Sequence, residues 1–205
     1  MTDVRGCHAT VLDWIERLTL LLLFAGLLWR IGPSLTQHPF NVLLLISDGL
    51  VVGLTLVRSP TERISRSGLD LILAMVGTAA PLLAITGGQP LIPGPVGNTL
   101  MVLGLGLSFY AKITLWRSFG LVAANRGVKS HGPYRMIRHP MYLGYFIGQV
   151  GFALLNPAPS ILIIYAAAFV LQILRIRAEE GLLGRDPAYA DYMGAVRYRL
   201  APGLF

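Results

Sequence analysis

Six runs of about 15–20 mostly apolar residues dominate this 205-residue chain and most constrain its fold. About 20 such residues are needed for an α-helix to cross the roughly 30 Å hydrocarbon core of a bilayer. Only 13% of the residues are charged, against about a quarter in soluble domains. We therefore expect an all-α integral membrane protein with about six transmembrane helices, at 14–31, 40–57, 69–85, 96–115, 141–155 and 160–176.

The last two apolar runs are short, and only Asn156-Pro157-Ala158-Pro159 separates them. A joint of four residues with two prolines predicts a tight antiparallel helical hairpin. We find no internal repeat and no linker long enough for a second domain. The chain is thus expected to form one continuous domain, in which residues 1–95 are N-terminal helices and 96–205 are a core with a C-terminal tail.

The basic residues lie on one side of this six-helix arrangement. Sixteen of the seventeen Lys and Arg residues fall on that side, and the exception is Arg30. Basic residues favour the cytoplasmic side of a membrane. Both termini are therefore expected in the cytoplasm, in a bacterial or archaeal cytoplasmic membrane. The same bias explains the net charge of +7 without a nucleic-acid partner.

The segment 132–142 contains two arginines, a histidine, two tyrosines and two prolines, directly before the fifth apolar run. Pro140 suits the first turn of a helix, where its missing N–H is not needed. The free N–H groups of that turn and the helix dipole favour an anion, which Arg138 and His139 would reinforce. Beside Tyr134 and Tyr142, this turn is a candidate binding site, although basic side chains also contact lipid headgroups.

A second polar cluster follows the sixth apolar run. Arg175 and Glu179 are four residues apart and share a helix face. Glu179 and Glu180 would oppose the helix dipole at its C-terminal end, so they need a cationic or hydroxyl-bearing partner. The simpler alternative is that Glu180 is solvated and that Arg175 extends towards the membrane surface.

Other polar or small residues lie within the apolar runs. Gly104 and Gly106 suit a close approach, either to a ligand or, more simply, to another helix. Lys112 and Asp70 are expected at the membrane interface, because both are near helix ends. Asp48 falls near the middle of the second run, so it is either a functional group or a carboxyl packed between helices. Four scattered histidines and one cysteine predict no metal site.

The C-terminal half also matches a known pattern. Gly-x-Tyr-x-x-x-Arg-His-Pro-x-Tyr, an apolar hairpin with Asn-Pro at its joint, Arg-x-x-x-Glu-Glu and Tyr-x-x-Tyr follow one another here. This order resembles the isoprenylcysteine carboxyl methyltransferase family. Phospholipid N-methyltransferases are similar and share the paired glutamates and a Gly-x-Gly. The resemblance covers about 96–202 and implies S-adenosylmethionine as cofactor, in a cytoplasmic pocket made by helix ends and loops.

The resemblance also implies roles for particular residues. Arg175, on the substrate side, Glu179 and Glu180 would act in catalysis. The cofactor contacts would fall on Gly104, Gly106, Arg126, Lys129, Tyr134, Arg138, His139, Pro140, Tyr142 and Glu179. Arg126 to Lys129 match by position only, since the residue types differ. The tail lacks the Phe-Gly of the family after Glu180 and is about two residues shorter.

The expected function is methyl transfer from S-adenosylmethionine to a lipophilic acceptor in the membrane. The acceptor would be a carboxylate of an isoprenoid-thiol compound, and the alternative is a phospholipid amine. An NADPH-dependent lipid reductase and a non-enzymatic transporter or scaffold are further alternatives. Asp48 alone is charged in the central third of a predicted helix, which argues against a transporter, because transporters place polar groups near the midplane.

Overall fold

The computed structural model describes residues 3–35, 40–59, 68–84, 87–120 and 124–203. In these residues the structure is helical and contains no β-strand, which confirms the all-α prediction. The α-helices are α1 (Asp3–Ile31), α2 (Phe40–Val57), α3 (Gly68–Ala79), α4 (Gly94–Leu115), α5 (Pro140–Leu155), α6 (Pro159–Leu183) and α7 (Pro187–Ala195).

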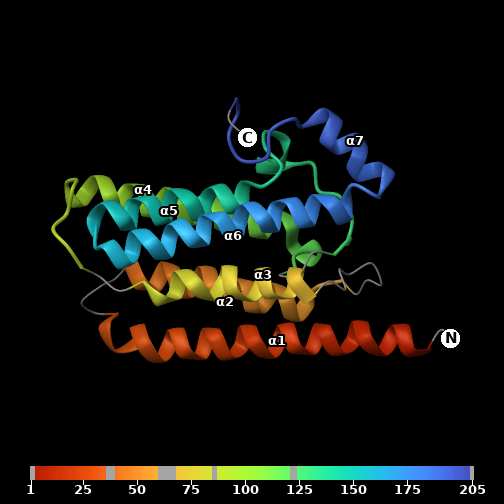
Figure 1. Cartoon of the computed structure of the whole chain (residues 1–205), viewed down its shortest axis with the longest axis horizontal. Helices are drawn as coiled ribbons and strands as arrows, with labels where there is room; N and C mark the ends of the chain where they lie inside the picture. Colours follow the sequence, from red (N-terminus) through yellow and green to blue (C-terminus); the bar gives the residue numbers. More distant parts are fainter. Residues whose placement is uncertain (1–2, 36–39, 60–67, 85–86, 121–123, 204–205) are drawn as a thin grey trace.

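The first six helices run back and forth along one common direction (Figure 1). In this view α1 forms one edge, α2 and α3 form a middle layer, and α4, α5 and α6 form the opposite layer. The short helix α7 and the C-terminal tail cover one end of the α4–α6 layer. This end, where α4 ends and α5 begins, is called the capped end below.

Helices occur at all six predicted positions, but they do not reach equal lengths. In the described part of the chain, two helical segments are long and apolar enough to cross a membrane, Gly94–Ser118 and Pro159–Leu183. The helix α5 has 16 residues and α3 has 12, which correspond to about 24 Å and 18 Å. A 3₁₀ turn that contains Pro81 follows α3, and the predicted end at residue 85 lies outside the described residues. Six spans therefore remain a prediction.

The helices α4 and α5 pack through glycines. A side chain at Gly104 would place its Cβ 2.4 Å from the backbone nitrogen of Gly148 and 2.5 Å from the carbonyl oxygen of Gly144. Such distances are possible only because these positions carry no side chain. Gly106, by contrast, has no atom of another element within 4 Å of its Cβ position. Gly104 thus acts in helix packing, the simpler of its two sequence interpretations.

Two buried charges join the N-terminal helices to each other and to α4. Arg58, just after α2, donates to Glu16 of α1 at 2.6 Å, and both side chains are buried. Lys112 of α4 is fully buried, and its Nζ donates to the side chain and the carbonyl of Ser47 at 2.8 and 3.2 Å. The expectation that Lys112 lies at the interface is wrong, because α2 supplies acceptors inside the bundle.

The sixth helix is longer than predicted, and α7 was not predicted. The helix α6 continues past Ile176 to Leu183, so Glu179 and Glu180 lie inside its last two turns. Asp186 caps α7, and its side chain accepts from the N–H of Ala188, with Pro187 in the first turn. An Asp-Pro pair is a usual start of a helix, so this signal was present in the sequence.

The glycine packing can be tested with a matched pair of substitutions. Gly104→Ala should force α4 and α5 apart and lower the free energy of unfolding by about 1–3 kcal/mol. Gly106→Ala meets open space and should be neutral or raise stability by up to about 1 kcal/mol. Thermal unfolding of both variants in detergent checks this. Equal stability of the two would contradict the packing role of Gly104.

Candidate functional site

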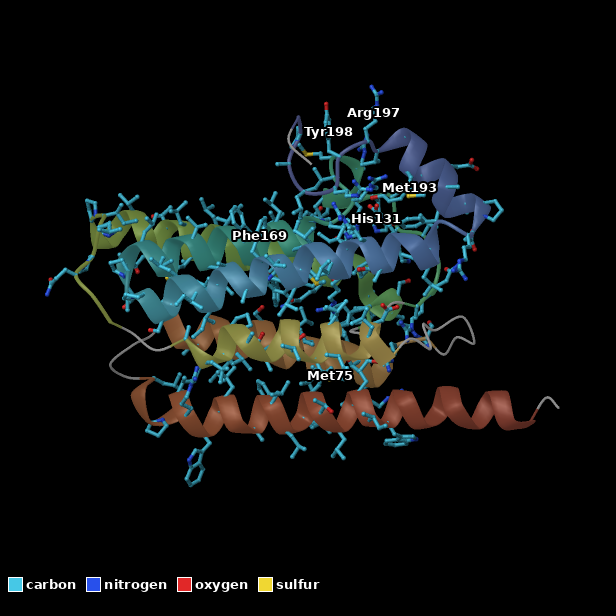
Figure 2. All side chains as sticks on the ribbon, in the orientation of Figure 1. Met75, His131, Phe169, Met193, Arg197 and Tyr198 are labelled. Carbon is cyan, nitrogen blue, oxygen red and sulfur yellow. The ribbon has the colours of Figure 1, made fainter. Side chains whose placement is uncertain are left out.

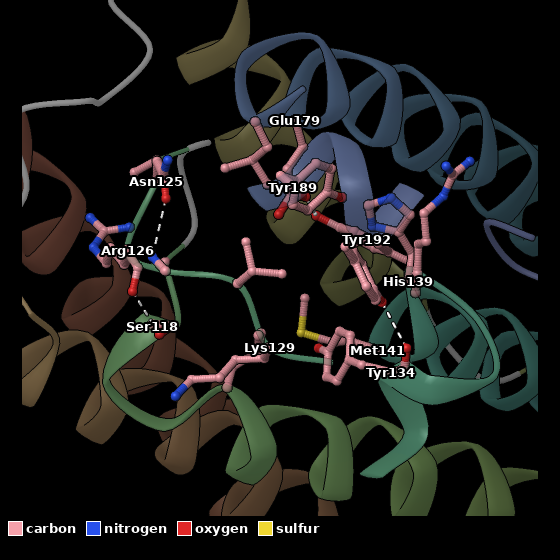
Figure 3. Close-up of a pocket in the computed structure, with 18 residues that line it drawn as sticks. Ser118, Asn125, Arg126, Lys129, Tyr134, His139, Met141, Glu179, Tyr189 and Tyr192 are labelled. Atoms are coloured by element: carbon pink, nitrogen blue, oxygen red, sulfur yellow. Dashed lines mark hydrogen bonds between the residues drawn. The ribbon is translucent and has the colours of Figure 1, made fainter. Parts of the chain in front are cut away.

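A small polar cavity of about 70 Å³ lies at the capped end (Figure 3). Its walls come from the end of α4, the loop residues 118–120 and 124–129, the turn before α5, the last turns of α6, and α7. Figure 3 shows the loop residues Asn125, Arg126 and Lys129 along one side and Tyr189, Tyr192 and His139 along the other. The cavity thus gathers segments that are far apart in the sequence.

Behind one wall of the cavity, Glu180 is the centre of a buried ion cluster. Its Oε1 lies 3.0 Å from Nε of Arg138 and accepts a hydrogen bond from Nε2 of His139, also at 3.0 Å. Its Oε2 accepts from Nε of Arg199 at 2.7 Å. Only 7% of the Glu180 side chain is exposed. The anion that Arg138 and His139 contact is therefore a carboxylate of the protein itself.

The tail also binds the backbone of this turn. The N–H groups of Arg138 and His139 donate to the carbonyls of Tyr198 and Arg199, at 2.9 and 2.8 Å. Figure 2 shows Arg197 and Tyr198 pointing away from the body of the protein. The tail is thus fixed by its main chain and by the inward side chain of Arg199, and it covers the beginning of α5.

Glu179 faces the cavity, unlike its neighbour. Its Oε2 accepts a hydrogen bond from the hydroxyl of Tyr142 at 3.2 Å, and both residues line the cavity. The rings of Tyr142 and His139 are 5.7 Å apart. One carboxylate of the pair therefore holds the protein together, and the other lines the cavity.

Three further tyrosines line the same cavity. The hydroxyl of Tyr192 donates to the carbonyl of Tyr134 at 2.8 Å (Figure 3), and the rings of Tyr189 and Tyr192 are 5.6 Å apart. Burial raises the pKa of Tyr192 to about 12. Burial and the carboxylate of Glu179 hold the pKa of Tyr134 well above its usual range. Both phenols therefore stay protonated. The hydroxyl of Tyr134 can donate to a ligand, whereas the hydroxyl hydrogen of Tyr192 is already donated to the carbonyl of Tyr134.

The loop with Arg126 and Lys129 is held by hydrogen bonds. Ser118 donates to the carbonyl of Arg126 at 2.9 Å, and Nε of Arg126 donates to the carbonyl of Ser59 at 3.1 Å. Asn125 reaches Asp186 at 2.7 Å. Gly127, with a φ of 94°, allows the sharp bend in this loop. The loop is thus connected both to the region after α2 and to the start of α7.

A second, larger cavity of about 520 Å³ lies between the first six helices. Most of its walls are apolar, with a few polar residues from several helices. Met141 and Tyr142 line both cavities, so the two spaces meet at these side chains. Arg175 lines the large cavity, and its Cζ lies 5.4 Å from the centre of the Tyr142 ring.

The structure brings most of the predicted site residues together. Those that line the small cavity are Arg126, Lys129, Tyr134, Arg138, His139, Tyr142 and Glu179. Pro140 begins α5 as predicted but does not line the cavity. Gly104 and Gly106 lie in the middle of α4, away from it, and Glu180 is behind its wall. Arg175 belongs to the large cavity.

Sequence reasoning missed the contribution of α7 and of the tail. Tyr189 and Tyr192 form the Tyr-x-x-Tyr of the sequence pattern, yet only the fold shows that both line the cavity. Arg199 was read as part of the basic bias alone, because no spacing in the sequence links it to Glu180. Asn125 likewise gave no signal, since its partner Asp186 is 61 residues away.

Comparison with known proteins gives a family match in the C-terminal half of the chain. Residues 94–186 match the family model described as phospholipid methyltransferase. This match begins with α4 and ends at the cap of α7, so it contains most of the residues that line the small cavity. It covers most of the segment, about 96–202, for which the sequence pattern predicted a methyltransferase.

A curated protein from Alcaligenes xylosoxydans xylosoxydans, the nickel-cobalt-cadmium resistance protein NccN, is 41% identical over 63 residues. The match covers 30% of this chain and 30% of that protein. The described residues contain no group of three or more His, Cys, Asp or Glu that could hold a metal ion. Because the match covers only 30% of each protein, it assigns no substrate to this chain.

The two neighbouring glutamates should differ in their effect on stability. Glu180→Gln leaves the buried Arg138 and the half-buried Arg199 without their counter-charge and should cost about 3–5 kcal/mol. Glu179→Gln can keep the hydrogen bond from Tyr142 through its amide oxygen and loses only the charge of the acceptor, so it should cost about 1 kcal/mol or less. Chemical or thermal unfolding in detergent measures both. A larger loss for Glu179→Gln would show that Glu180 is not the structural centre.

Proposed function

We propose that this chain, which through residues 94–186 belongs to the phospholipid methyltransferase family, transfers a methyl group from S-adenosylmethionine to a lipophilic acceptor. The family supports a methyltransferase that acts at a membrane, and two helices long enough to span a bilayer agree with this setting. The nature of the acceptor is argued below from the residues of the two cavities.

One observation carries the proposal, namely that a polar and an apolar cavity meet at Met141 and Tyr142. A water-soluble methyl donor and an acceptor soluble in lipid need separate environments that share one boundary. Methyl transfer to a nucleophile requires the two reactants to be aligned and water to be excluded. The junction at Tyr142 is the place where both conditions can be met.

The residues of the small cavity fit S-adenosylmethionine in chemical type. Glu179 can hold its ammonium group or ribose hydroxyls, and the protonated tyrosines offer aromatic faces and hydrogen-bond donors. Arg126 and Lys129 supply positive charge for its carboxylate. The predicted contact of that carboxylate with Arg138 and His139 is less direct, because both side chains already contact Glu180.

The size of the small cavity adds a requirement. Its volume of about 70 Å³ is below the roughly 300–1,000 Å³ of typical ligand pockets. Binding of the cofactor therefore requires the walls to separate. In this proposal α7 and the tail move, since they cover the cavity. Their movement has to break the bonds of Arg199 to Glu180 and of Tyr192 to Tyr134, as well as main-chain hydrogen bonds.

The acceptor would approach through the large cavity, beside Arg175. A guanidinium can hold a carboxylate or a phosphate with two parallel hydrogen bonds. A carboxylate of an isoprenoid-thiol compound fits this residue directly. The alternative acceptor, a phospholipid amine, fits as well if Arg175 holds the phosphate, and the family description favours it.

The cofactor assignment can be tested at Glu179. Glu179→Gln should weaken binding of S-adenosylhomocysteine at least about tenfold, which corresponds to about 1.4 kcal/mol. Asp191→Asn, an exposed carboxylate of α7, is the matched control and should leave the affinity unchanged. Titration calorimetry measures both. Unchanged affinity of Glu179→Gln, or tight NADPH binding instead, would remove the proposal.

The acceptor side can be tested at Arg175. Arg175→Lys keeps the charge and loses the two-pronged geometry, so it should slow methyl transfer about tenfold or more, with S-adenosylhomocysteine affinity nearly intact. Arg177→Lys, an exposed position two residues further on α6, is the control. Radiolabelled methyl transfer to a farnesylated thiol acid and to phosphatidylethanolamine vesicles distinguishes the two acceptors. If Arg175→Lys instead lost cofactor binding and kept normal turnover at saturating cofactor, Arg175 would belong to the cofactor site and not to the acceptor site.

A further inference from the structure

We propose that the large cavity recognises its ligand through a hydrogen-bond-donating group, an amine or a hydroxyl, which Gln149 and Asp48 receive. The proposal depends on the proposed function only where it calls this ligand the methyl acceptor. The recognition itself is argued from the cavity.

Gln149 is the first observation. It lines the large cavity from α5, and its Oε1 atom is buried without a hydrogen-bond partner in the part of the chain that the structure describes. Buried polar atoms nearly always have a partner, because a lone acceptor that is removed from water is costly. An oxygen of this kind, beside a cavity of about 520 Å³, is suited to a donor on a ligand.

Asp48 is the second, independent observation. It lines the same cavity from the middle of α2, and the opposite charge that acts on it is Lys112. The hydrogen bonds of Lys112 go to Ser47 instead. Within the described residues, the Asp48 carboxylate has no hydrogen bond or salt bridge of its own. A carboxylate is an acceptor only, so it too is suited to a donor.

Both acceptors lie on the same stretch of the cavity. Lys112 Nζ is 2.8 Å from Ser47 of α2 and 5.2 Å from the ring centre of Tyr145 of α5. Asp48, next to Ser47, therefore lies near the level of Tyr145. Gln149 follows Tyr145 by four residues and shares its helix face. The cavity thus contains two acceptors within about one helical turn of each other, surrounded by apolar residues.

Their position sets the shape of the ligand. Gln149 is seven residues along α5 from Tyr142, where the cavities meet, and seven residues span about 10 Å of helix. Tyr145, the level of Asp48, is three residues from Tyr142, so the donor group lies about 5–10 Å deeper than the junction. Arg175 lies at the junction itself, 5.4 Å from the Tyr142 ring centre. The ligand would have one polar group at the junction and a second, hydrogen-donating group deeper in the cavity.

Chain-matched amphiphiles test this recognition without knowledge of the natural acceptor. The probes are 1-dodecanol, dodecylamine and 1-methoxydodecane, at equal mole fraction in detergent, with binding followed by thermal shift. The alcohol or the amine should bind about tenfold tighter than the ether, which has no donor. Whichever of these two probes binds more tightly shows whether the recognised donor is a hydroxyl or an amine. Equal binding of all three would overturn the proposal and leave a cavity selective for apolar chains only.

Substitutions assign the preference to the two residues. Gln149→Leu and Asp48→Leu should each reduce the preference for the alcohol or the amine over the ether severalfold. Gln89→Leu, at an exposed residue outside the cavity, should retain this preference.

Without ligand, Gln149→Leu should unfold at the same or a higher temperature, since an unpaired buried oxygen is replaced by apolar atoms. A lower unfolding temperature with an unchanged preference would show that Gln149 has another role. Asp48→Asn keeps the shape of the side chain and removes its charge, so it is a second test of this position. It should weaken binding of the amine more than binding of the alcohol.

One further measurement separates this proposal from the proposed function. All these variants should bind S-adenosylhomocysteine as the wild type does, because neither residue lines the small cavity. A wild type that fails to bind S-adenosylhomocysteine but prefers the alcohol to the ether would refute the methyltransferase and keep this inference. Normal S-adenosylhomocysteine binding without that preference would refute this inference alone.

Discussion

The capped end of the protein depends on the buried carboxylate of Glu180. A carboxylate that leaves water needs several donors, and here two segments supply them. Arg138 and His139 come from the turn before α5, and Arg199 comes from the tail, 19 residues after Glu180. This cluster fixes the end of α6 relative to the start of α5. Because successive residues of a helix point in different directions, fixing Glu180 also determines that Glu179 faces the small cavity, within 3.2 Å of Tyr142.

The packing of α4 against α5 determines how the cavity beyond Tyr142 is built. Glycines bring the two backbones together at Gly104, Gly144 and Gly148. A contact made by backbone atoms leaves little freedom to slide, since a single added Cβ would collide. The larger side chains of α5, such as Tyr145 and Gln149, therefore extend towards α2 and α6 and line the large cavity.

Much of this arrangement could be predicted from the sequence, and the reasons for the exceptions are physical. Apolar runs located six helices, and Pro140 correctly marked the start of α5, because local rules determine both. The ion cluster could not be predicted, since the partners of Glu180 are 19 to 42 residues away and any of 17 basic residues could have met it. Lys112 was misplaced for the same reason, because its acceptor in α2 is 65 residues earlier. Spacing along the chain predicts the face of one helix, whereas burial and partners depend on the packing of several helices.

Tyr142 is the residue at which these constraints combine. Its hydroxyl binds Glu179 on the side of the small cavity, and its ring lies beside Arg175 on the side of the large one. In the proposed reaction the methyl group must pass between reactants about 3–3.5 Å apart, so donor and acceptor have to meet within one side-chain width. A wall one residue thick permits this, whereas two cavities separated by a packed layer of helices would not. Tyr142, which separates the two cavities, is therefore also the side chain that must move when donor and acceptor meet.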